Sequence, residues 1–563
     1  MRRSPRGQNA ISALFSALLL LCSLSLQASE QPGRSAIATA HPAATVAGRE
    51  TLALGGNAFD AAVAISAALA VVEPYGSGLG GGGLFLLRNA DATYGFIDAR
   101  ERAPGAAHAD LYRRDGQVQA ALSRDGALAA AIPGLPAALV ELAGQHGRLP
   151  LRDSLAPAIR LAREGFPVDR VYRERAEMRL AAMRDDAETA RLFLDDGAVP
   201  REGTLLRQPE LAETLLMLAR GGRDGFYTGP LAERLVAGVR AAGGIWTLQD
   251  LADYRAVRRQ PLRVPLADGR ELISAPPPSA GGLALAQSLL VLQHLPWRET
   301  EPVQRSHLVV ETLRRVYRDR GLLGDPDFID NPTAALLAPA YLQRLSDSID
   351  PRRATPSSEL SPAGTWKEGD HTTHFTVLDA DGNAVSATLS INLPFGAAFT
   401  VPGTGVLLND EMDDFAADLT GANAYGLTGS HANAIAAGKR PLSSMSPTFL
   451  ESASEFTSFG TPGGSRIPSM VLLSILEYLD GQPIARWPAV PRYHHQYLPD
   501  VIEHEPETFS AAQIADLQAR GHSLKALERV YGNQQVLLWN KASGQVEAAS
   551  DPRGIGSSDV QSH

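Results

Sequence analysis

The feature that most constrains the fold is a pair of β-rich runs in the stretch TTHFTVLDADGNAVSATLSIN, about two-thirds of the way along the chain. The runs flank Asp381-Gly382, a dipeptide that favours a tight two-residue turn between antiparallel strands. A loop of these two residues alone makes the numbers of paired residues sum to 763. That register places Ser390 opposite Thr373 and within one residue of Thr372. The sequence therefore predicts a β-hairpin with hydroxyl groups of both strands at its open end.

These hydroxyl groups have two interpretations. Cross-strand pairs of Thr and Ser are common in sheets and stabilise them without any chemistry. The alternative is a hydrolase whose nucleophile is an N-terminal threonine, with the α-amino group of that residue as its base. An α-amino group has a pKa of about 7.7–8.0, so a useful fraction is unprotonated near neutral pH. Thr372 acquires such an amine only if the preceding bond is cut, and residues 351–370, rich in Pro, Ser and charge, indicate an exposed loop that lets the new end move away.

Composition limits the classes of protein to which the chain can belong. The chain of 563 residues is longer than a domain built around one small core, which indicates several domains or one large layered domain. Hydrophobic residues make up 44% and charged residues 20%, the balance of an ordinary globular protein. The formal charge of −10 offers no basic stripe to neutralise phosphates, so we expect no nucleic-acid partner.

Residues 1–28 are typical of a secretory signal peptide. Three arginines precede an apolar run that extends to about Leu26, and small residues follow, so we expect cleavage after Ala28. Loss of the three arginines takes the formal charge from −10 to −13. The only cysteine, Cys22, lies in this segment, where the bulky leucines before it disfavour a lipid anchor. We therefore expect a periplasmic or secreted chain that has no thiol, no disulfide and no membrane anchor.

Other segments bear on the layers of the fold and on cofactors. Residues 57–76 are Ala-rich with helical spacing and end in a proline and a glycine, which predicts a buried helix. The glycine run that follows leads into an apolar strand, the reverse of a phosphate-binding loop, so it indicates close backbone packing. Amphipathic segments between residues 130 and 260 predict a helical layer. His494 and His495 lack a third ligand at metal-binding spacing, and we expect no metal or other cofactor.

Several motifs together make a specific resemblance. The chain resembles the γ-glutamyltransferase (γ-glutamyl transpeptidase) family of N-terminal nucleophile (Ntn) hydrolases. Besides the hairpin, the motifs that carry the resemblance follow the family's order along nearly the whole chain after residue 35: EPYGSGLGGGG, DARERAP, LLNDEMDDF, KRPLSSMSPT, GTPGGSRI and PRYHHQYLPD. The resemblance implies an α+β fold, a four-layer αββα sandwich. It also implies autocatalytic cleavage between His371 and Thr372, which yields a large subunit of residues 29–371 and a small subunit of residues 372–563 in one intertwined unit.

The resemblance implies roles for individual residues as well. Thr372 is the nucleophile of self-cleavage and of γ-glutamyl transfer. Ser390 stands where many members have a threonine whose hydroxyl bonds to the nucleophile, so the donor is kept and a methyl is lost. The backbone N–H groups of Gly463 and Gly464 form the oxyanion hole, where close approach of backbone suits glycine. A clamp holds the donor's amino-acid end: Arg100, Ser443 and Ser444 bind the α-carboxylate, and Asn392, Glu411 and Asp414 bind the α-ammonium.

The expected reaction is γ-glutamyl transfer from glutathione and related small molecules to water, amino acids or peptides. Tyr425 falls at the aromatic position of the family's lid loop, which relatives that act on glutaryl-cephalosporins or polyglutamate commonly lack or change. An acylase of that kind is one alternative. A catalytically silent binding protein on the same fold is another, although the intact Thr372 and glycine pair argue against it.

Overall fold

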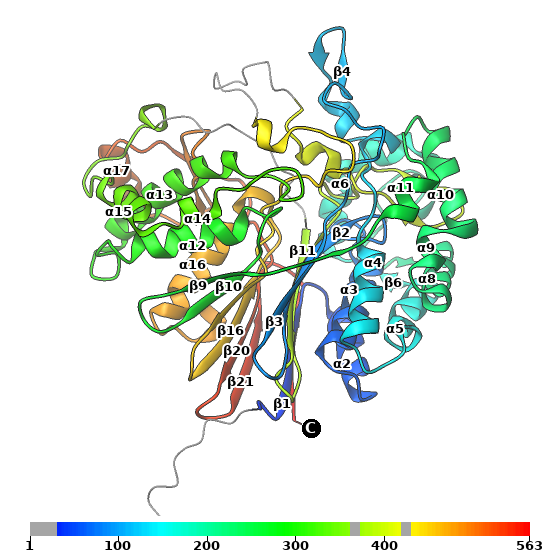
Figure 1. The fold of residues 1–563 in the computed structure, drawn as a ribbon, viewed down its shortest axis with the longest axis horizontal. Helices are drawn as coiled ribbons and strands as arrows, with labels where there is room; N and C mark the ends of the chain where they lie inside the picture. Colours follow the sequence, from blue (N-terminus) through cyan, green and yellow to red (C-terminus); the bar gives the residue numbers. More distant parts are fainter. Residues whose placement is uncertain (1–30, 361–371, 418–429, 563) are drawn as a thin grey trace, which may run out of the picture.

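The computed structural model of the chain describes residues 31–360, 372–417 and 430–562. Two β-sheets pack face to face, and a layer of helices covers the outer face of each sheet (Figure 1). The predicted four-layer αββα sandwich is confirmed. Among the helices of the described residues, none combines the length and apolarity needed to cross a bilayer.

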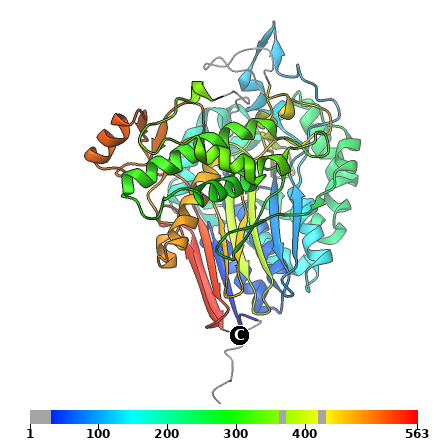
Figure 2. The ribbon, with the colours of Figure 1, turned by 60° about the vertical axis from the view of Figure 1, so that its left-hand side comes forward.

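The larger sheet takes its strands from both ends and the middle of the chain. In spatial order its seven strands are β22 (Ser557–Ser562), β1 (Arg34–Thr39), β11 (Thr372–Leu378), β12 (Ala384–Ser390), β2 (Gly82–Arg88), β3 (Tyr94–Ala99) and β8 (Val257–Arg259). The turned view of Figure 2 shows blue, yellow-green and red strands running side by side. Segments before and after Thr372 therefore share one sheet, and neither can complete it alone.

The second sheet is antiparallel throughout. Its six strands are, in spatial order, β21 (Gln545–Ser550), β20 (Gln535–Asn540), β16 (Glu455–Gly460), β15 (Thr448–Glu451), β10 (Glu271–Ser274) and β9 (Leu262–Pro265). Polar side chains join the two sheets, because the Thr376 hydroxyl of β11 donates to the Ser458 hydroxyl of β16 at 2.7 Å.

Two sets of helices flank the sheets. The set against the larger sheet begins with α2 (Pro42–Ala53) and α3 (Ala58–Val72). Its other members confirm the helical layer expected between residues 130 and 260: α4 (Leu135–Gln145), α5 (Leu151–Glu164), α6 (Arg170–Asp185), α7 (Ala187–Phe193), α8 (Pro209–Gly221), α9 (Asp224–Tyr227), α10 (Gly229–Ala241) and α11 (Leu248–Asp253). The other set covers the second sheet: α12 (Gly281–Leu292), α13 (Pro302–Asp319), α14 (Thr333–Leu336), α15 (Pro339–Asp347), α16 (Ile467–Leu479) and α17 (Ala511–Ala519).

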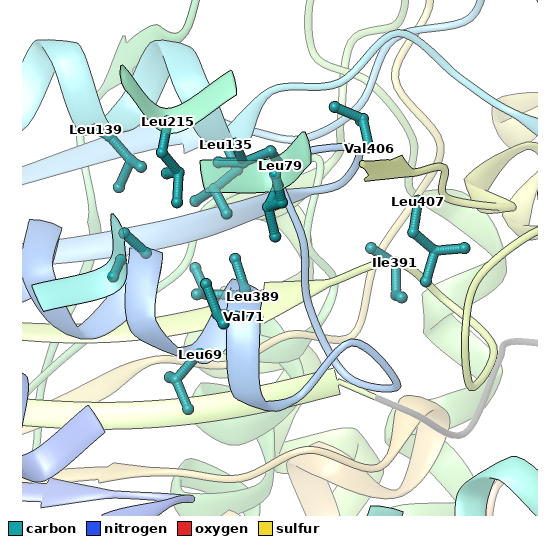
Figure 3. Close-up of a cluster of buried hydrophobic side chains, with 14 of the residues drawn as sticks. Leu69, Val71, Leu79, Leu135, Leu139, Leu215, Leu389, Ile391, Val406 and Leu407 are labelled. Atoms are coloured by element: carbon teal, nitrogen blue, oxygen red, sulfur yellow. The ribbon is translucent and has the colours of Figure 1, made fainter. Parts of the chain in front are cut away.

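The buried helix predicted over residues 57–76 is confirmed as α3, all of whose residues are buried. Asn57 caps its N-terminus, and the Asp60 carboxylate accepts from the Asn57 N–H in return. Small alanines let the helix lie close to the hairpin behind it. Figure 3 shows Leu69 and Val71 of α3 beside Leu389 of β12, in the cluster that packs this end of the hairpin.

The glycine run after α3 serves close backbone packing, as predicted. A Cβ atom at Gly80 would lie 2.0 Å from the Leu407 carbonyl oxygen, and one at Gly81 would lie 2.2 Å from the Ser390 carbonyl oxygen. No side chain fits at those distances. The run therefore brings β2 against the end of β12, next to the predicted nucleophile.

The hairpin is confirmed, but its predicted register was wrong by one residue. Thr372 lies directly opposite Ser390, and paired residue numbers sum to 762, as in the pair Leu378 and Ala384. The loop has three residues instead of two, because the Asp379 N–H donates to the Asn383 carbonyl at 2.9 Å and the Asp379 carboxylate accepts from the Asn383 N–H. Gly382 has φ +95°, the left-handed residue of a three-residue loop.

The loop expected over residues 351–370 is described only as far as residue 360. Residues 351–353 are exposed, whereas Ser357 is buried, with its hydroxyl donating to the Tyr497 carbonyl at 2.6 Å. The first half of the segment is thus partly anchored. Residues 361–371, with His371 among them, lie outside the described residues, as does the predicted signal peptide.

Candidate active site

Thr372 begins β11 at the open end of the hairpin, and Ser390 ends β12 directly opposite it. The Thr372 hydroxyl oxygen accepts a hydrogen bond from the Gly463 N–H at 3.2 Å. The Ser390 oxygen accepts from the Asn392 N–H at 2.8 Å. Within the described residues no hydrogen bond joins the two hydroxyl groups, although their strand positions make them neighbours.

Gly463 and Gly464 lie where the chain turns from β16 into α16. Gly463 has φ +138°, a conformation that only glycine adopts readily, and a Cβ atom there would lie 2.5 Å from the Met470 Cε. Gly464 opens the 3₁₀ turn Gly464–Arg466 that leads into the helix. Backbone N–H groups at such a helix start carry partial positive charge, so they suit the negative oxygen of a tetrahedral intermediate.

Arg100 is the centre of a buried ion cluster. It follows β3 and is only 1% exposed, and the Tyr254 hydroxyl donates to its carbonyl at 2.7 Å. One guanidinium nitrogen lies 2.8 Å from a Glu411 carboxylate oxygen, and the other terminal nitrogen donates to the Asp414 carboxylate. The residues predicted to bind opposite ends of the donor's α-amino acid therefore lie within contact of one another.

Glu101 adds a third acid to this cluster, and sequence reasoning missed it. Its carboxylate lies 3.6 Å from the Arg100 guanidinium and is fully buried. Burial raises the pKa of Glu101 to about 8, with further contributions from the negative charges of Asp414 and Asp98, while Arg100 opposes the rise. Burial also raises the pKa of Glu411. One guanidinium cannot neutralise three carboxylates, so the cluster retains a proton near neutral pH.

Ser443 and Ser444 are each 1% exposed and lie on a segment held against the loop before α12. The Ser443 N–H donates to the Pro278 carbonyl at 2.8 Å, and the Ser443 hydroxyl oxygen accepts from the Met445 N–H at 3.1 Å. The Ser444 hydroxyl accepts from the Arg320 Nε at 3.2 Å. Arg320, at the end of α13, is thus a second buried cation beside the predicted carboxylate binders, and no motif pointed to it.

Asn392 has φ +71°, a left-handed conformation that asparagine tolerates better than most residues. Its side-chain amide donates to the carbonyl and the carboxylate of Asp410 at 3.1 and 3.2 Å. Burial holds the pKa of Asp410 well above its usual range. Asn392 is therefore fixed beside Ser390 and next to Asp410, the residue that precedes Glu411.

Two further predictions concern Tyr425 and the adjacent histidines. Tyr425, at the expected lid position, lies outside the described residues. His494 bonds to the Ser469 hydroxyl at 2.8 Å and His495 lies 3.2 Å from the Asp500 carboxylate, so both rings have partners in the surrounding core. No group of three or more His, Cys, Asp or Glu residues suited to a metal ion occurs in the described part of the chain.

Comparison with known proteins gives a consistent family. The model of the gamma-glutamyltranspeptidase family matches residues 44–560. The chain is 38% identical to the glutathione hydrolase proenzyme of Pseudomonas sp. (strain A14) over 510 residues, which cover 88% of each chain.

Solved structures agree on the fold. A cephalosporin acylase from Bacillus halodurans superposes with a TM-score of 0.82 at 26% identity, covering 93% of this chain and 95% of that one. Helicobacter pylori gamma-glutamyltranspeptidase matches with a TM-score of 0.56 at 35% identity over 58% of this chain and 96% of that one. The Ntn-hydrolase sandwich, the family match and the relatives together make this chain a member of the γ-glutamyltranspeptidase family, an enzyme of the γ-glutamyltransferase class.

Proposed function

We propose that the chain transfers the γ-glutamyl group of glutathione and related small molecules to water, amino acids or peptides through an ester on Thr372. One observation carries the proposal. Thr372 begins a central strand, and its hydroxyl oxygen accepts a hydrogen bond from the Gly463 N–H at 3.2 Å. Acyl transfer needs at least a nucleophilic oxygen and a nearby hydrogen-bond donor for the oxyanion.

Maturation precedes this activity. The Thr372 oxygen attacks the His371 carbonyl carbon, the acyl group moves from nitrogen to oxygen, and water cleaves the resulting ester. Residues 29–371 and 372–563 then form the two subunits of one sandwich, whose shared sheet keeps them together. The cut frees the Thr372 α-amino group, which is the nearest base to its own hydroxyl.

In the transfer itself, the α-amino group takes the Thr372 hydroxyl proton as the oxygen attacks the donor's γ-carbonyl carbon. The Gly463 and Gly464 N–H groups receive the negative oxygen, and the leaving amine takes the proton away. Ser390, opposite the nucleophile, supplies a hydroxyl that orients the reacting oxygen. Water or an acceptor amine then attacks the ester carbon and releases Thr372.

The clamp selects a donor with both an α-carboxylate and an α-ammonium. Arg100, Ser443 and Ser444 take the carboxylate, while Asn392, Glu411 and Asp414 take the ammonium. A zwitterion suits this site because it inserts one positive and one negative charge into an ion cluster that is already close to balance. A glutaryl group carries no ammonium and leaves the acids uncompensated, so an acylase of glutaryl-cephalosporins is not favoured.

Residues 1–28 direct export in this proposal, and the mature enzyme acts in the periplasm or outside the cell. The central test is mass spectrometry of the purified protein followed by assay of γ-glutamyl-p-nitroanilide with and without glycylglycine. We expect two fragments that divide before Thr372, release of p-nitroaniline, and faster release when the acceptor is present. A single uncut chain without turnover would support a silent binding protein instead.

A further inference from the structure

A cavity of about 100 Å³ opens beside the nucleophile and is separate from the donor clamp. Thr372 and Gly463 form part of its wall, whereas none of the clamp residues lines it. The remaining wall comes from the turn after α3, the N-terminal half of α6 and the segments around Asn533 and Arg553. An occupant of this cavity has direct access to the ester carbon on Thr372.

Most charged groups of the cavity wall already have partners. Arg170 pairs with Glu174 at 2.6 Å, one helical turn along α6. Arg553 pairs with Glu505 at 2.6 Å and with Asp551 at 3.2 Å. Both arginines therefore already have carboxylate partners.

Arg175 is the exception among the arginines of this wall. Within the described residues no carboxylate lies within 4.0 Å of its guanidinium, which donates to the Met178 sulfur at 3.8 Å. It is half-buried on α6, and burial, reinforced by the nearby Arg529, lowers its pKa. A desolvated cation without a counterion is costly, and a bound carboxylate would relieve that cost.

The opposite charge on the wall belongs to Glu73, at the end of α3. Its carboxylate accepts from the Tyr75 hydroxyl at 3.1 Å, and no ion pair to it is found among the described residues. Burial raises the pKa of Glu73. Burial therefore opposes ionisation of Glu73, and no carboxylate of the described residues lies within 4.0 Å of the Arg175 guanidinium.

We infer that this cavity is the acceptor subsite of γ-glutamyl transfer, and that Arg175 binds the free carboxylate of an acceptor amino acid or short peptide. The inference rests on the proposed function. With the carboxylate held at Arg175, the acceptor amine lies toward Thr372 and attacks the ester carbon. A carbon–nitrogen bond forms, the bond to the Thr372 oxygen breaks, and the Thr372 amine passes the acceptor's proton to that oxygen.

The chemistry also predicts which acceptors work well. Glycylglycine carries the carboxylate that Arg175 requires, whereas glycylglycine amide has the same amine and nearly the same shape without that charge. The donor γ-glutamyl-p-nitroanilide has no carboxylate on its leaving group, so its hydrolysis reports on the clamp and the nucleophile without involving Arg175.

The test measures transfer from γ-glutamyl-p-nitroanilide to both acceptors in wild type and in Arg175→Ala. We expect wild type to show a KM at least about tenfold lower for glycylglycine than for its amide. The Arg175→Ala variant should lose that preference by a rise in KM for glycylglycine alone, and Arg175→Lys should recover part of it. Hydrolysis of the donor should change by less than about twofold.

Arg184→Ala is the matched control, because Arg184 is exposed near the far end of the same helix and does not line the cavity. It should keep the wild-type acceptor preference. Equal KM values of the two acceptors in wild type would overturn the inference even if Arg175→Ala failed to fold, and so would an unchanged preference in a folded, cleaved Arg175→Ala. Failure of the proposed function looks different, because wild type would then release no p-nitroaniline at all.

Discussion

The two sides of Thr372 handle charge in opposite ways. On the clamp side, Arg100 is 1% exposed and forms ion pairs with Glu411 and Asp414 in the absence of a ligand. On the cavity side, Arg175 is half-buried and lacks a carboxylate partner among the described residues. The paired cluster around Arg100 favours a ligand that carries both a positive and a negative charge, whereas Arg175 alone favours any ligand with a carboxylate. The difference predicts a strict donor site and a permissive acceptor site around one nucleophile.

The largest effect should come from removing the group that the two sides share. Thr372→Ala has no hydroxyl to attack the His371 carbonyl, so we expect one uncut chain and loss of activity by at least about a thousandfold. Thr372→Ser should still cut, more slowly. Gel electrophoresis and mass spectrometry provide the readout, and two normal-sized fragments from the alanine variant would show that cleavage is not autocatalytic.

A charge removed from the clamp alone should affect donors selectively. Asp414→Asn keeps the side-chain shape but loses the charge that compensates the donor's ammonium, which is worth roughly 1.5–3 kcal/mol. We expect kcat/KM for a γ-glutamyl anilide to fall at least about tenfold, while slow turnover of a glutaryl anilide stays nearly unchanged and self-cleavage remains complete.

Asp413→Asn is the matched control for that variant, since the Asp413 carboxylate contacts Ser123 and Arg124 instead of Arg100. Its donor kinetics should stay close to wild type. Equal losses on the γ-glutamyl and glutaryl anilides in Asp414→Asn would assign Asp414 to the fold or to the nucleophile, and the ammonium site would then centre on Glu411 and Asn392.

Protonation of the buried Glu101 carboxyl should make the stability of the protein depend on pH. Because the folded pKa of about 8 exceeds the ordinary value of 4.5, the folded state holds a proton that the unfolded state releases between these pH values. Stability should therefore fall as pH rises from about 5 to 8, by at most about 1.4 kcal/mol per pH unit from this group, and level off above.

Glu101→Gln removes that pH dependence. The melting temperature of Glu101→Gln minus that of wild type should increase steadily from pH 5 to pH 8. The exposed control Glu164→Gln should show the same melting temperatures as wild type throughout. Thermal unfolding across that pH range measures the difference. A constant offset between Glu101→Gln and wild type would mean that Glu101 is ionised at both ends of the range.

The smallest effect is expected at Ser390, which is 2% exposed and faces Thr372 across the hairpin. Ser390→Thr keeps the hydroxyl and adds one methyl group, so we expect a change in kcat of no more than about threefold and normal self-cleavage. Ser390→Ala, which removes the hydroxyl, should slow both steps more. Equal rates in the two variants would remove the Ser390 hydroxyl from the chemistry.

The hairpin shows what local rules predict and where they stop. The β-rich runs around Asp381-Gly382 predicted two strands correctly, because that signal depends only on neighbours along the chain. The register was wrong by one residue, because the Asp379 carboxylate binds the Asn383 N–H and favours a three-residue loop with Gly382 in the left-handed conformation. That side-chain contact competes with the dipeptide rule, and the rule does not include it.

The clamp shows the same limit at longer range. The motifs named Arg100, Glu411 and Asp414, and the structure brings all three together. Sequence reasoning divided them between two ends of a substrate and missed Glu101, although it adjoins Arg100 in the chain. Arg320 and Arg175 carried no motif at all, since an arginine in an amphipathic helix is ordinarily a solvated residue.

The sequence by itself indicated the chemical types at the site through its motifs, and the family resemblance that these motifs carry implied the layered fold, because motifs are local properties of the chain. Only the tertiary structure decided which charges meet. Arg100 contacts Glu411 and Asp414 across more than three hundred positions of the chain. Arg175 lines the cavity beside Thr372, and no carboxylate in the described part of the chain lies within 4.0 Å of its guanidinium. Electrostatic free energy depends on the distances between charges and on their burial, and both quantities follow from the tertiary structure and not from the order of residues along the chain.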